Sequence, residues 1–233
     1  MHNIATKVEE KMTALRKNSY FSDLSESLIT ELSQGTYLRR FAAGEAVCWQ
    51  GEACAGLCII RKGTVKLFKL SGRGRELIIR VLSEGATFNE VPVFDRGQNP
   101  VNVAALEECE IWLVEQEVIR RALKSHPELA ERVILNLSHN LRMLVEMLEE
   151  LSFYQVTNRL ARLIGQLPSE QLEGQATQRI TQDQLAARLG TVREVVARSL
   201  RELERSGAIE VKRRQIQVVN QSILQDWAQG PLN

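Results

Sequence analysis

The sequence contains no apolar run that approaches the roughly 18–20 residues of a membrane-spanning helix. Its first residues, MHNIATKVEEK, are polar and lack the apolar segment of a signal peptide. Net charge is almost absent too, at +1, so any interaction with an anionic polymer depends on local clusters of Lys and Arg. These absences predict a cytoplasmic protein without a membrane partner.

The sequence is also poor in residues that hold metals or react as nucleophiles. It has three histidines and four cysteines, at positions 48, 54, 58 and 109. Structural disulfides are rare in a reducing compartment, so we expect the cysteines to be small buried apolar residues, with redox sensing as the alternative. We find no nucleophile–base pair, phosphate-binding glycine loop or metal-ligand spacing, and therefore expect a protein that is not an enzyme.

A heptad pattern is present between about Pro127 and Phe153. Its apolar residues alternate in steps of four and three, at Ala130, Ile134, Leu137, Leu141, Leu144, Leu148 and Leu151. Such a pattern is typical of a coiled-coil seam, here sustained over about three heptads. A narrow seam suits a second copy of the same helix, so residues 134–151 of this row are the predicted interface of a homodimer. The alternative is a helix buried within one domain.

The residues before this helix change from a helical to a strand-like pattern. Residues 1–34 are rich in helix formers and predict short helices. Residues 36–113 contain short β-branched and apolar runs, such as LCIIRKG, TVKLFKL and CEIWLV, separated by glycines. Many short strands at regular spacing predict a compact antiparallel barrel, roll or sandwich.

Residues 180–205, ITQDQLAARLGTVREVVARSLRELER, predict a helix–turn–helix. Thr181 with Gln184 forms a capping box, Gly190 ends the first helix, and Thr191 with Glu194 suggests a second box that starts the next helix. That second helix has an apolar face and a polar face, the latter with Arg193, Glu194, Ala197, Arg198, Arg201 and Arg205. Two short strands, AIEVK and QIQVV, then flank a basic tip at Lys212, Arg213 and Arg214 and predict a wing.

The whole arrangement resembles a known family. The runs FAAGEAVCWQGE, LCIIRKGTVKLFKL, GRGREL and GATFNEVPVFDRGQ are similar to the cyclic-nucleotide-binding β-roll. Followed by a long helix and a helix–turn–helix, they resemble the bacterial CRP/FNR superfamily of transcription regulators over about residues 20–220. This resemblance implies an α+β fold with three parts: N-terminal helices and an effector-sensing β-roll (1–126), a dimerisation helix (127–153) and a winged helix–turn–helix DNA-binding domain (154–233).

The resemblance also locates an effector pocket, whose residues differ from those of cyclic-AMP-binding members. Where those members have Gly-Glu-Leu and Arg-Ser, this chain has Asn89-Glu90-Val91 and Pro100-Val101. A buried phosphate without its arginine would cost several kcal/mol, so cyclic AMP is not the expected effector. The adenine-contacting Thr-Ser pair is replaced by apolar residues, and the predicted pocket comprises Phe88, Glu90, Val91, Pro100, Val101, Leu144 and Val145.

The identity of the effector stays open between an apolar molecule, haem and none. Haem would need an axial ligand, for which the candidates are His2, His126, His139, the cysteines or a methionine. His139 lies off the heptad seam and is expected to be exposed. The family's iron–sulfur members use a cysteine cluster near the N-terminus, and this chain has no cysteine before Cys48. The alternatives are therefore a haem- or redox-dependent gas sensor and a member that is active without ligand.

The family resemblance assigns DNA contacts to the second helix of the helix–turn–helix. Arg193 would bind a guanine edge, Glu194 would accept from a cytosine amine and Arg198 would contact a second guanine, on palindromic double-stranded DNA with TGTGA-like half-sites. For Glu194 a purely capping role is the alternative. Contacts to the DNA backbone are expected from Thr181, Thr191, Arg201, Lys212, Arg213 and Arg214.

The resemblance further implies contact with RNA polymerase through the loop around residues 172–178. A more distant alternative is a cyclic-nucleotide-binding regulatory subunit that does not bind DNA. The arginine-bearing helix and the basic wing argue against it.

Overall fold

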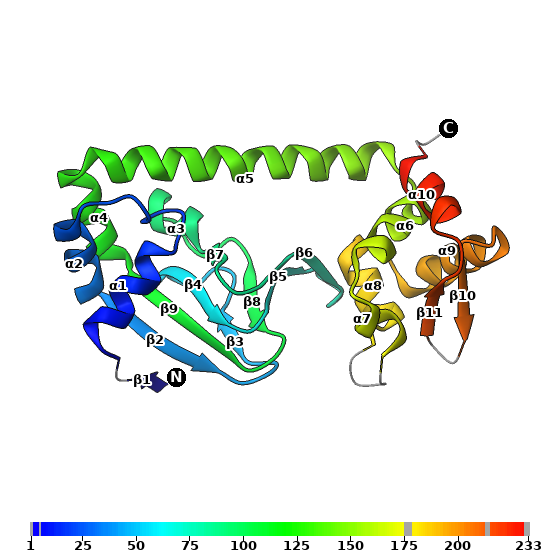
Figure 1. The fold of residues 1–233 in the computed structure, drawn as a ribbon, viewed down its shortest axis with the longest axis horizontal. Coiled ribbons are helices and arrows are strands. Elements are labelled where there is room, and N and C mark those ends of the chain that lie inside the picture. The colour runs from blue at the N-terminus through cyan, green and yellow to red at the C-terminus, as the bar shows by residue number, and fades with distance from the viewer. Residues whose placement is uncertain (1, 5, 175–178, 213–214, 231–233) are drawn as a thin grey trace. The chain divides into compact units, whose positions relative to one another are not determined.

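The computed structural model describes residues 2–4, 6–174, 179–212 and 215–230. By internal contacts the chain divides into two compact units. Unit 1 comprises Met1–Lys69 and Ile79–Leu141, and unit 2 comprises Leu70–Ile78 and Arg142–Asn233. Figure 1 shows the order of the elements along the chain. The two units are considered separately below.

Unit 1 begins with a short strand and two helices. Strand β1 (His2–Ile4) is followed by α1 (Val8–Arg16) and α2 (Glu26–Gln34). The expectation that residues 1–34 are helical is therefore wrong at their start, because β1 pairs with the free edge of β2 (Thr36–Phe41) in an antiparallel ladder. Helix α2 starts at Ser25, whose Oγ accepts a hydrogen bond from the Leu28 N–H at 3.4 Å.

Two antiparallel sheets form the β-roll, which confirms the predicted α+β fold. One sheet has the strand order β1-β2-β9-β4-β7 and the other has the order β3-β8-β5-β6. The remaining strands are β3 (Ala46–Cys48), β4 (Gly56–Lys62), β5 (Val65–Leu70), β6 (Glu76–Leu82), β7 (Thr87–Phe88), β8 (Asn102–Ala105) and β9 (Cys109–Glu115). Helix α3 (Glu90–Asp95) follows β7, and α4 (Gln116–Ser125) follows β9.

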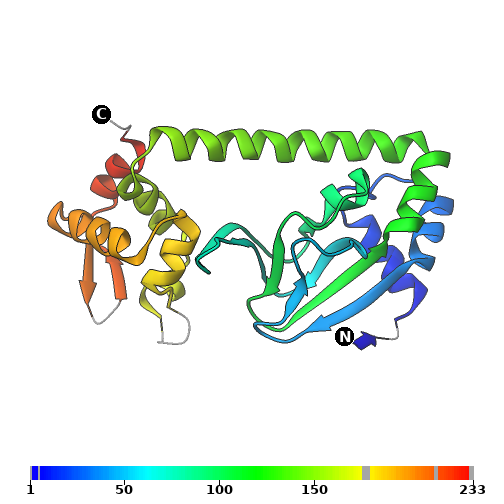
Figure 2. The same ribbon diagram turned by 180° about the vertical axis from the view of Figure 1, so that it is seen from behind.

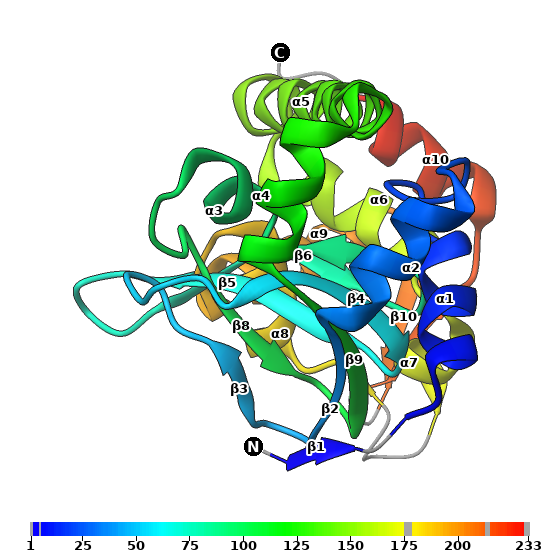
Figure 3. The same cartoon turned by 90° about the vertical axis from the view of Figure 1, so that its left-hand side faces the viewer.

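The larger sheet buries both of its faces. Leu38 and Trp112 pack in one core with the buried residues of α1, α2 and α4, and α1 and α2 lie beside the strands in Figure 3. Phe41, Ile111 and Leu113 belong to a second core inside the roll. Successive side chains of a strand point to opposite faces, which explains why β9 contributes to both cores.

Helix α5 (Pro127–Phe153) is a single unbroken helix, as Figure 2 shows. Leu129 and Val133 near its start are buried in unit 1. The next helix, α6, begins at Val156, so the helical path is interrupted at Tyr154–Gln155. None of the helices within the described ranges combines the length and the apolar character that a membrane span requires.

The C-terminal part of unit 2 is a small helical domain with a two-stranded wing. Its elements are α6 (Val156–Gln166), α7 (Ser169–Glu173), α8 (Gln182–Leu189), α9 (Arg193–Arg205), β10 (Ile209–Lys212), β11 (Gln215–Val218) and α10 (Gln221–Gln229). Leu160, Leu185, Leu200 and Leu224 share its apolar core. Helix α10 was not predicted from the sequence; it starts at Asn220, whose side chain accepts from the Ile223 N–H.

Candidate functional site

Helices α8 and α9 form the predicted helix–turn–helix. Thr181 caps α8 with both hydrogen bonds of a capping box to Gln184. Gly190 ends α8 in the left-handed conformation, with φ of 65°, which glycine adopts without the strain of a side chain. The predicted second capping box is wrong, because α9 starts one residue later than expected and its N-cap is the apolar Val192.

The two faces of α9 differ as the sequence predicted. Val196, Leu200 and Leu203 are buried in the domain core. The residues assigned to base recognition, Arg193, Glu194 and Arg198, are exposed, as are Arg201 and Arg205. Since Glu194 does not cap the helix, the capping alternative no longer explains it.

Arg193 lies within ion-pair distance of the preceding helix. Its Nη1 is 3.7 Å from Oδ2 of Asp183 on α8, and both side chains are mostly exposed. An exposed pair of this kind contributes little to stability, so Arg193 can exchange Asp183 for another acceptor at low cost.

The wing is held against α9 by a hydrogen bond. The Val211 N–H on β10 donates to the Glu204 carboxylate on α9 at 3.0 Å. Lys212 at the end of β10 is exposed and pairs with Glu210 at 2.6 Å. Arg213 and Arg214, which the family resemblance assigns to the DNA backbone, lie outside the described residues. Thr181 and Thr191, which are assigned to the backbone too, lie at the starts of α8 and α9.

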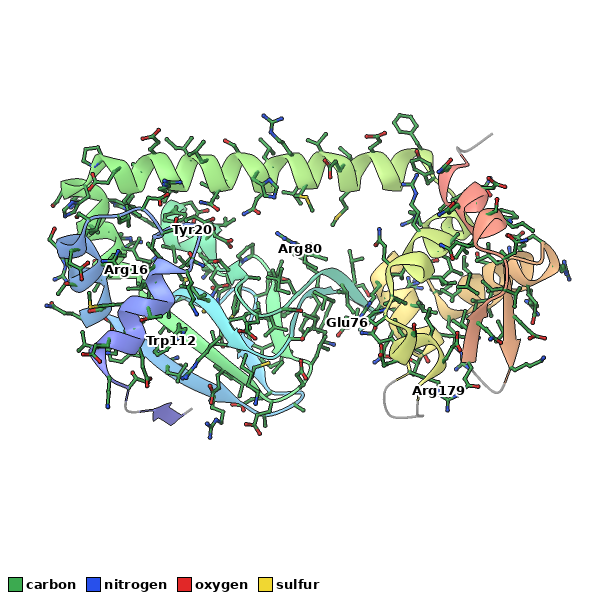
Figure 4. The ribbon with its side chains drawn as sticks, in the orientation of Figure 1. Arg16, Tyr20, Glu76, Arg80, Trp112 and Arg179 are labelled. Atoms are coloured by element: carbon green, nitrogen blue, oxygen red, sulfur yellow. The ribbon has the colours of Figure 1, made fainter. Side chains whose placement is uncertain are left out.

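In unit 1 a polar cluster surrounds Glu90, the first residue of α3. The Glu90 carboxylate lies beside Tyr20, Asn140 of α5 and Arg80 of β6. Arg80 Nη1 is 3.5 Å from the Asn140 Oδ1. Tyr20 and Arg80 are labelled in Figure 4. Burial raises the pKa of Glu90, and the neighbouring Arg80 acts in the opposite direction. Burial and the Glu90 charge raise the pKa of Tyr20.

Three members of this cluster, Tyr20, Arg80 and Asn140, were missed from the sequence. Arg80 is the one basic residue in the sequence of β6, ELIIRVL. A charged residue within an apolar strand could have indicated a polar partner nearby. Asn140 lies off the heptad seam. Tyr20 comes from the segment before α2, and only the tertiary fold brings it to Glu90.

The other predicted pocket residues differ in their burial. Phe88 is fully buried in the core of the roll, and Val101 packs against the same core. Val91 is 51% exposed, and Pro100 is also exposed. Leu144 and Val145 belong to unit 2 and are both exposed.

A cavity of about 110 Å³ lies inside the roll and is lined by Cys48, Cys58, Asn89 and Asn99, among others. Its volume is well below the roughly 300–1,000 Å³ of pockets that hold drug-sized ligands. Burial raises the pKa of Cys48 to about 11, and the pKa values of Cys54, Cys58 and Cys109 are also raised by burial. The four side chains are therefore neutral thiols at neutral pH.

The histidine candidates for a haem ligand are placed as follows. His139 is exposed, as predicted from its position off the seam. His126 lies 3.3 Å from Glu128 and 3.8 Å from Glu31. The side chain of His2 lies outside the described residues. Within the part of the chain that the structure describes, no group of three His, Cys, Asp or Glu side chains could hold a metal ion.

Comparison with known proteins gives matches to both halves of the chain. Residues 38–126 match the family model of the cyclic nucleotide-binding domain, and residues 158–227 match that of the Crp-like helix-turn-helix domain. The cyclic AMP receptor protein of Thermus thermophilus is 28% identical over 192 residues, which cover 82% of this chain and 88% of that protein. The cAMP-activated global transcriptional regulator Vfr of Pseudomonas aeruginosa is 29% identical over 182 residues, covering 75% and 85%.

A solved structure shows the same fold. A transcriptional regulator of the Crp/Fnr family from Eubacterium rectale superposes with a TM-score of 0.78 at 19% identity, covering 91% of this chain and 100% of that chain. A cyclic nucleotide-binding domain joined to a Crp-like helix-turn-helix defines a class of DNA-binding transcription regulators. The chain belongs to the CRP/FNR family of these regulators.

Proposed function

We propose that the protein binds, as a homodimer, a palindromic DNA site with half-sites similar to TGTGA. The observation that carries this proposal is the surface of α9, which exposes Arg193, Glu194 and Arg198 while burying Val196 and Leu200. Arginine pairs with the O6 and N7 atoms of guanine, and glutamate accepts from the amine of cytosine. The exposed row thus fits G·C-rich positions in a major groove.

The dimer part of the proposal is supported by an exposed apolar row on α5. Ile134, Leu141 and Leu148 repeat every seven residues and are 64%, 62% and 64% exposed. Leu137 is partly buried against the core of unit 1, and Leu144 is 52% exposed. The side chain of Leu151 is not among those that the structure describes. A row of leucines at heptad spacing is what a second copy of the helix would cover.

The proposed effector is a molecule other than cyclic AMP. The relatives from T. thermophilus and P. aeruginosa are named for cyclic AMP. This chain has Pro100 and Val101 at the positions where the family resemblance implies the Arg-Ser clamp, and Pro100 is exposed. Isothermal titration with cyclic AMP should therefore show no saturable binding. The absorption spectrum of the purified protein tests haem, because a Soret band would establish it.

Contact with RNA polymerase belongs to the proposal on family grounds. The loop assigned to it begins at Leu172, which is buried in the domain core, and continues past α7. Residues 175–178 of this loop lie outside the described residues.

A mobility-shift experiment tests the proposed DNA site. The palindromic probe should bind more tightly than a probe in which about five base pairs are inserted between the half-sites, because this insertion turns the second half-site to the opposite face of the duplex. A scrambled probe of the same length serves as the control. Equal affinity for the three probes would contradict the proposal.

A further inference from the structure

Three side chains form a hydrogen-bonded chain between α6 and the recognition helix α9. Thr157 Oγ1 in the first turn of α6 lies 2.8 Å from Ser199 Oγ and 2.7 Å from Glu202 Oε2. Thr157 and Ser199 are 5% and 3% exposed, whereas Glu202 lies at the surface. The chain therefore runs from the buried helix contact to the edge of α9.

The donors and acceptors in this chain are fixed by chemistry. A hydroxyl has one proton, and an ionised carboxylate can only accept. Thr157 Oγ1 is the donor to both the Ser199 Oγ and the Glu202 carboxylate, so its one proton is shared between two acceptors on α9. Both contacts therefore depend on the Thr157 hydroxyl.

These directional bonds do something that the apolar contacts of α9 cannot do. Val196, Leu200 and Leu203 attach α9 to the core by burial, which is non-directional. Side chains that recognise a ligand must be held within about 10–20° of their working orientation. Hydrogen bonds weaken steeply when they are bent, so they resist such a rotation.

We infer that Thr157 is a positioning residue, which fixes the rotation of α9 through Ser199 and Glu202 and thereby sets sequence discrimination. Ser199 directly follows Arg198, and Glu202 lies one helical turn beyond it, so the bonds act where base recognition is proposed. Thr157 itself follows the interruption at residues 154–155. The inference rests on the proposed function, since it concerns discrimination between DNA sequences.

Substitutions at Thr157 test this role in the full-length protein. Thr157→Val removes the hydroxyl with little change in shape, and Thr157→Ser retains it. The matched control is Asn158→Ala, because Asn158 is 6% exposed and donates to the Trp227 carbonyl of α10 at 2.8 Å, not to α9. Dissociation constants for the TGTGA-type palindrome and for a scrambled duplex are measured by fluorescence anisotropy at one salt concentration, together with thermal unfolding.

The expected result is a loss of specificity without a loss of general DNA binding. Thr157→Val should lower the ratio of specific to non-specific affinity by about tenfold, which corresponds to weakening of about one base contact. In Thr157→Ser the same affinity ratio should stay within about twofold of the wild-type value. Asn158→Ala should lower the melting temperature and leave the ratio unchanged. If Thr157→Val does not fold, Glu202→Ala removes the exposed acceptor and should lower the same ratio.

Several results would overturn the inference. One is an unchanged ratio in Thr157→Val, or in Glu202→Ala where that variant replaces it. A second is a ratio in Thr157→Ser that is as low as in Thr157→Val. A third is a ratio in Asn158→Ala that falls as far as in Thr157→Val. Effects of Thr157→Val and Glu202→Ala that simply add in the double variant would also contradict it, because partners in one bond are not independent. A wild-type protein without preference for the palindrome would instead contradict the proposed function, and this outcome is visible before any variant is made.

Discussion

Arg193 is the single residue whose loss should affect base recognition most directly. Its guanidinium is exposed at the start of α9 and is paired only loosely with Asp183. Arg193→Ala should cost about 1–3 kcal/mol of binding free energy on the specific site and relax the preference at one base pair. Competition binding with single-base variants of the palindrome measures both effects.

A matched control for this substitution is Arg16→Ala. Arg16 is an arginine of α1 that pairs with Glu26 and has no proposed DNA contact. Its loss should leave the affinity for every duplex unchanged. If Arg193→Ala instead weakened binding to the palindrome and to random DNA equally, Arg193 would be a backbone contact.

The half-buried Cys48 predicts how stability depends on pH. Burial raises the pKa of Cys48 to about 11, above the roughly 8.5 of a cysteine in the unfolded chain. Between these values the unfolded state releases its proton while the folded state retains it. The free energy of unfolding should therefore hold from neutral pH to about 8.5 and fall as the pH rises toward 11.

Urea unfolding of the wild type and of Cys48→Ser, at neutral pH and near pH 10, measures this contribution. Serine does not titrate in this range, so the variant should lose less stability at high pH than the wild type does. Cys54, Cys58 and Cys109 remain and keep part of the slope. Identical pH dependence in the two proteins would show that the Cys48 thiol does not contribute.

The polar cluster around Glu90 illustrates which residues sequence reasoning can and cannot find. Glu90 was identified because it occupies a position that the family resemblance marks. Tyr20, Arg80 and Asn140 lie in three segments far apart in the chain, and none of them belongs to a local motif. Their proximity depends on how the strands and α5 pack, which periodicity does not encode.

At the scale of elements, the starts of α8 and α9 differ in their capping, although the sequence predicts a threonine cap for both helices. Thr181 caps α8, whereas Thr191 precedes the N-cap of α9. Thr181→Ala should therefore destabilise the protein by about 1 kcal/mol. Thr191→Ala should change the free energy of unfolding by less than about 0.5 kcal/mol. Thermal unfolding without DNA makes the comparison, and the opposite ranking would restore the second capping box.

The elements that were predicted correctly have strong patterns, and those that were missed have weak ones. The heptads of α5 and the two faces of α9 each follow a clear period, and β4 and β9 are short, almost continuous apolar runs. Helix α10 is short and has one fully buried residue, Leu224, so its apolar stripe is narrow. Strand β1 forms only because it pairs with β2, which lies more than 30 residues further along the chain, and its own residues carry no strand pattern.

At the scale of the whole molecule, the proposed dimer connects the apolar row of α5 to recognition of a palindrome. Burying one leucine contributes about 1.5–3 kcal/mol, and each substitution in the row acts twice in a symmetric dimer. The double variant Leu141→Asn and Leu148→Asn should therefore be monomeric by light scattering. The control is Leu135→Asn, because Leu135 is 55% exposed on the same helix but lies outside the heptad positions, and this variant should remain a dimer.

Loss of the dimer should also change how the protein binds DNA. Two recognition helices in one assembly make the second half-site contact effectively intramolecular, which raises the affinity without any new contact. A monomer lacks this advantage, so the double variant should bind the palindrome no more tightly than a duplex with one half-site. The wild type and the Leu135→Asn variant should prefer the palindrome strongly. If the double variant were monomeric and kept that preference, the palindrome would be recognised without the α5 interface, and the link between the apolar row and the DNA site would be wrong.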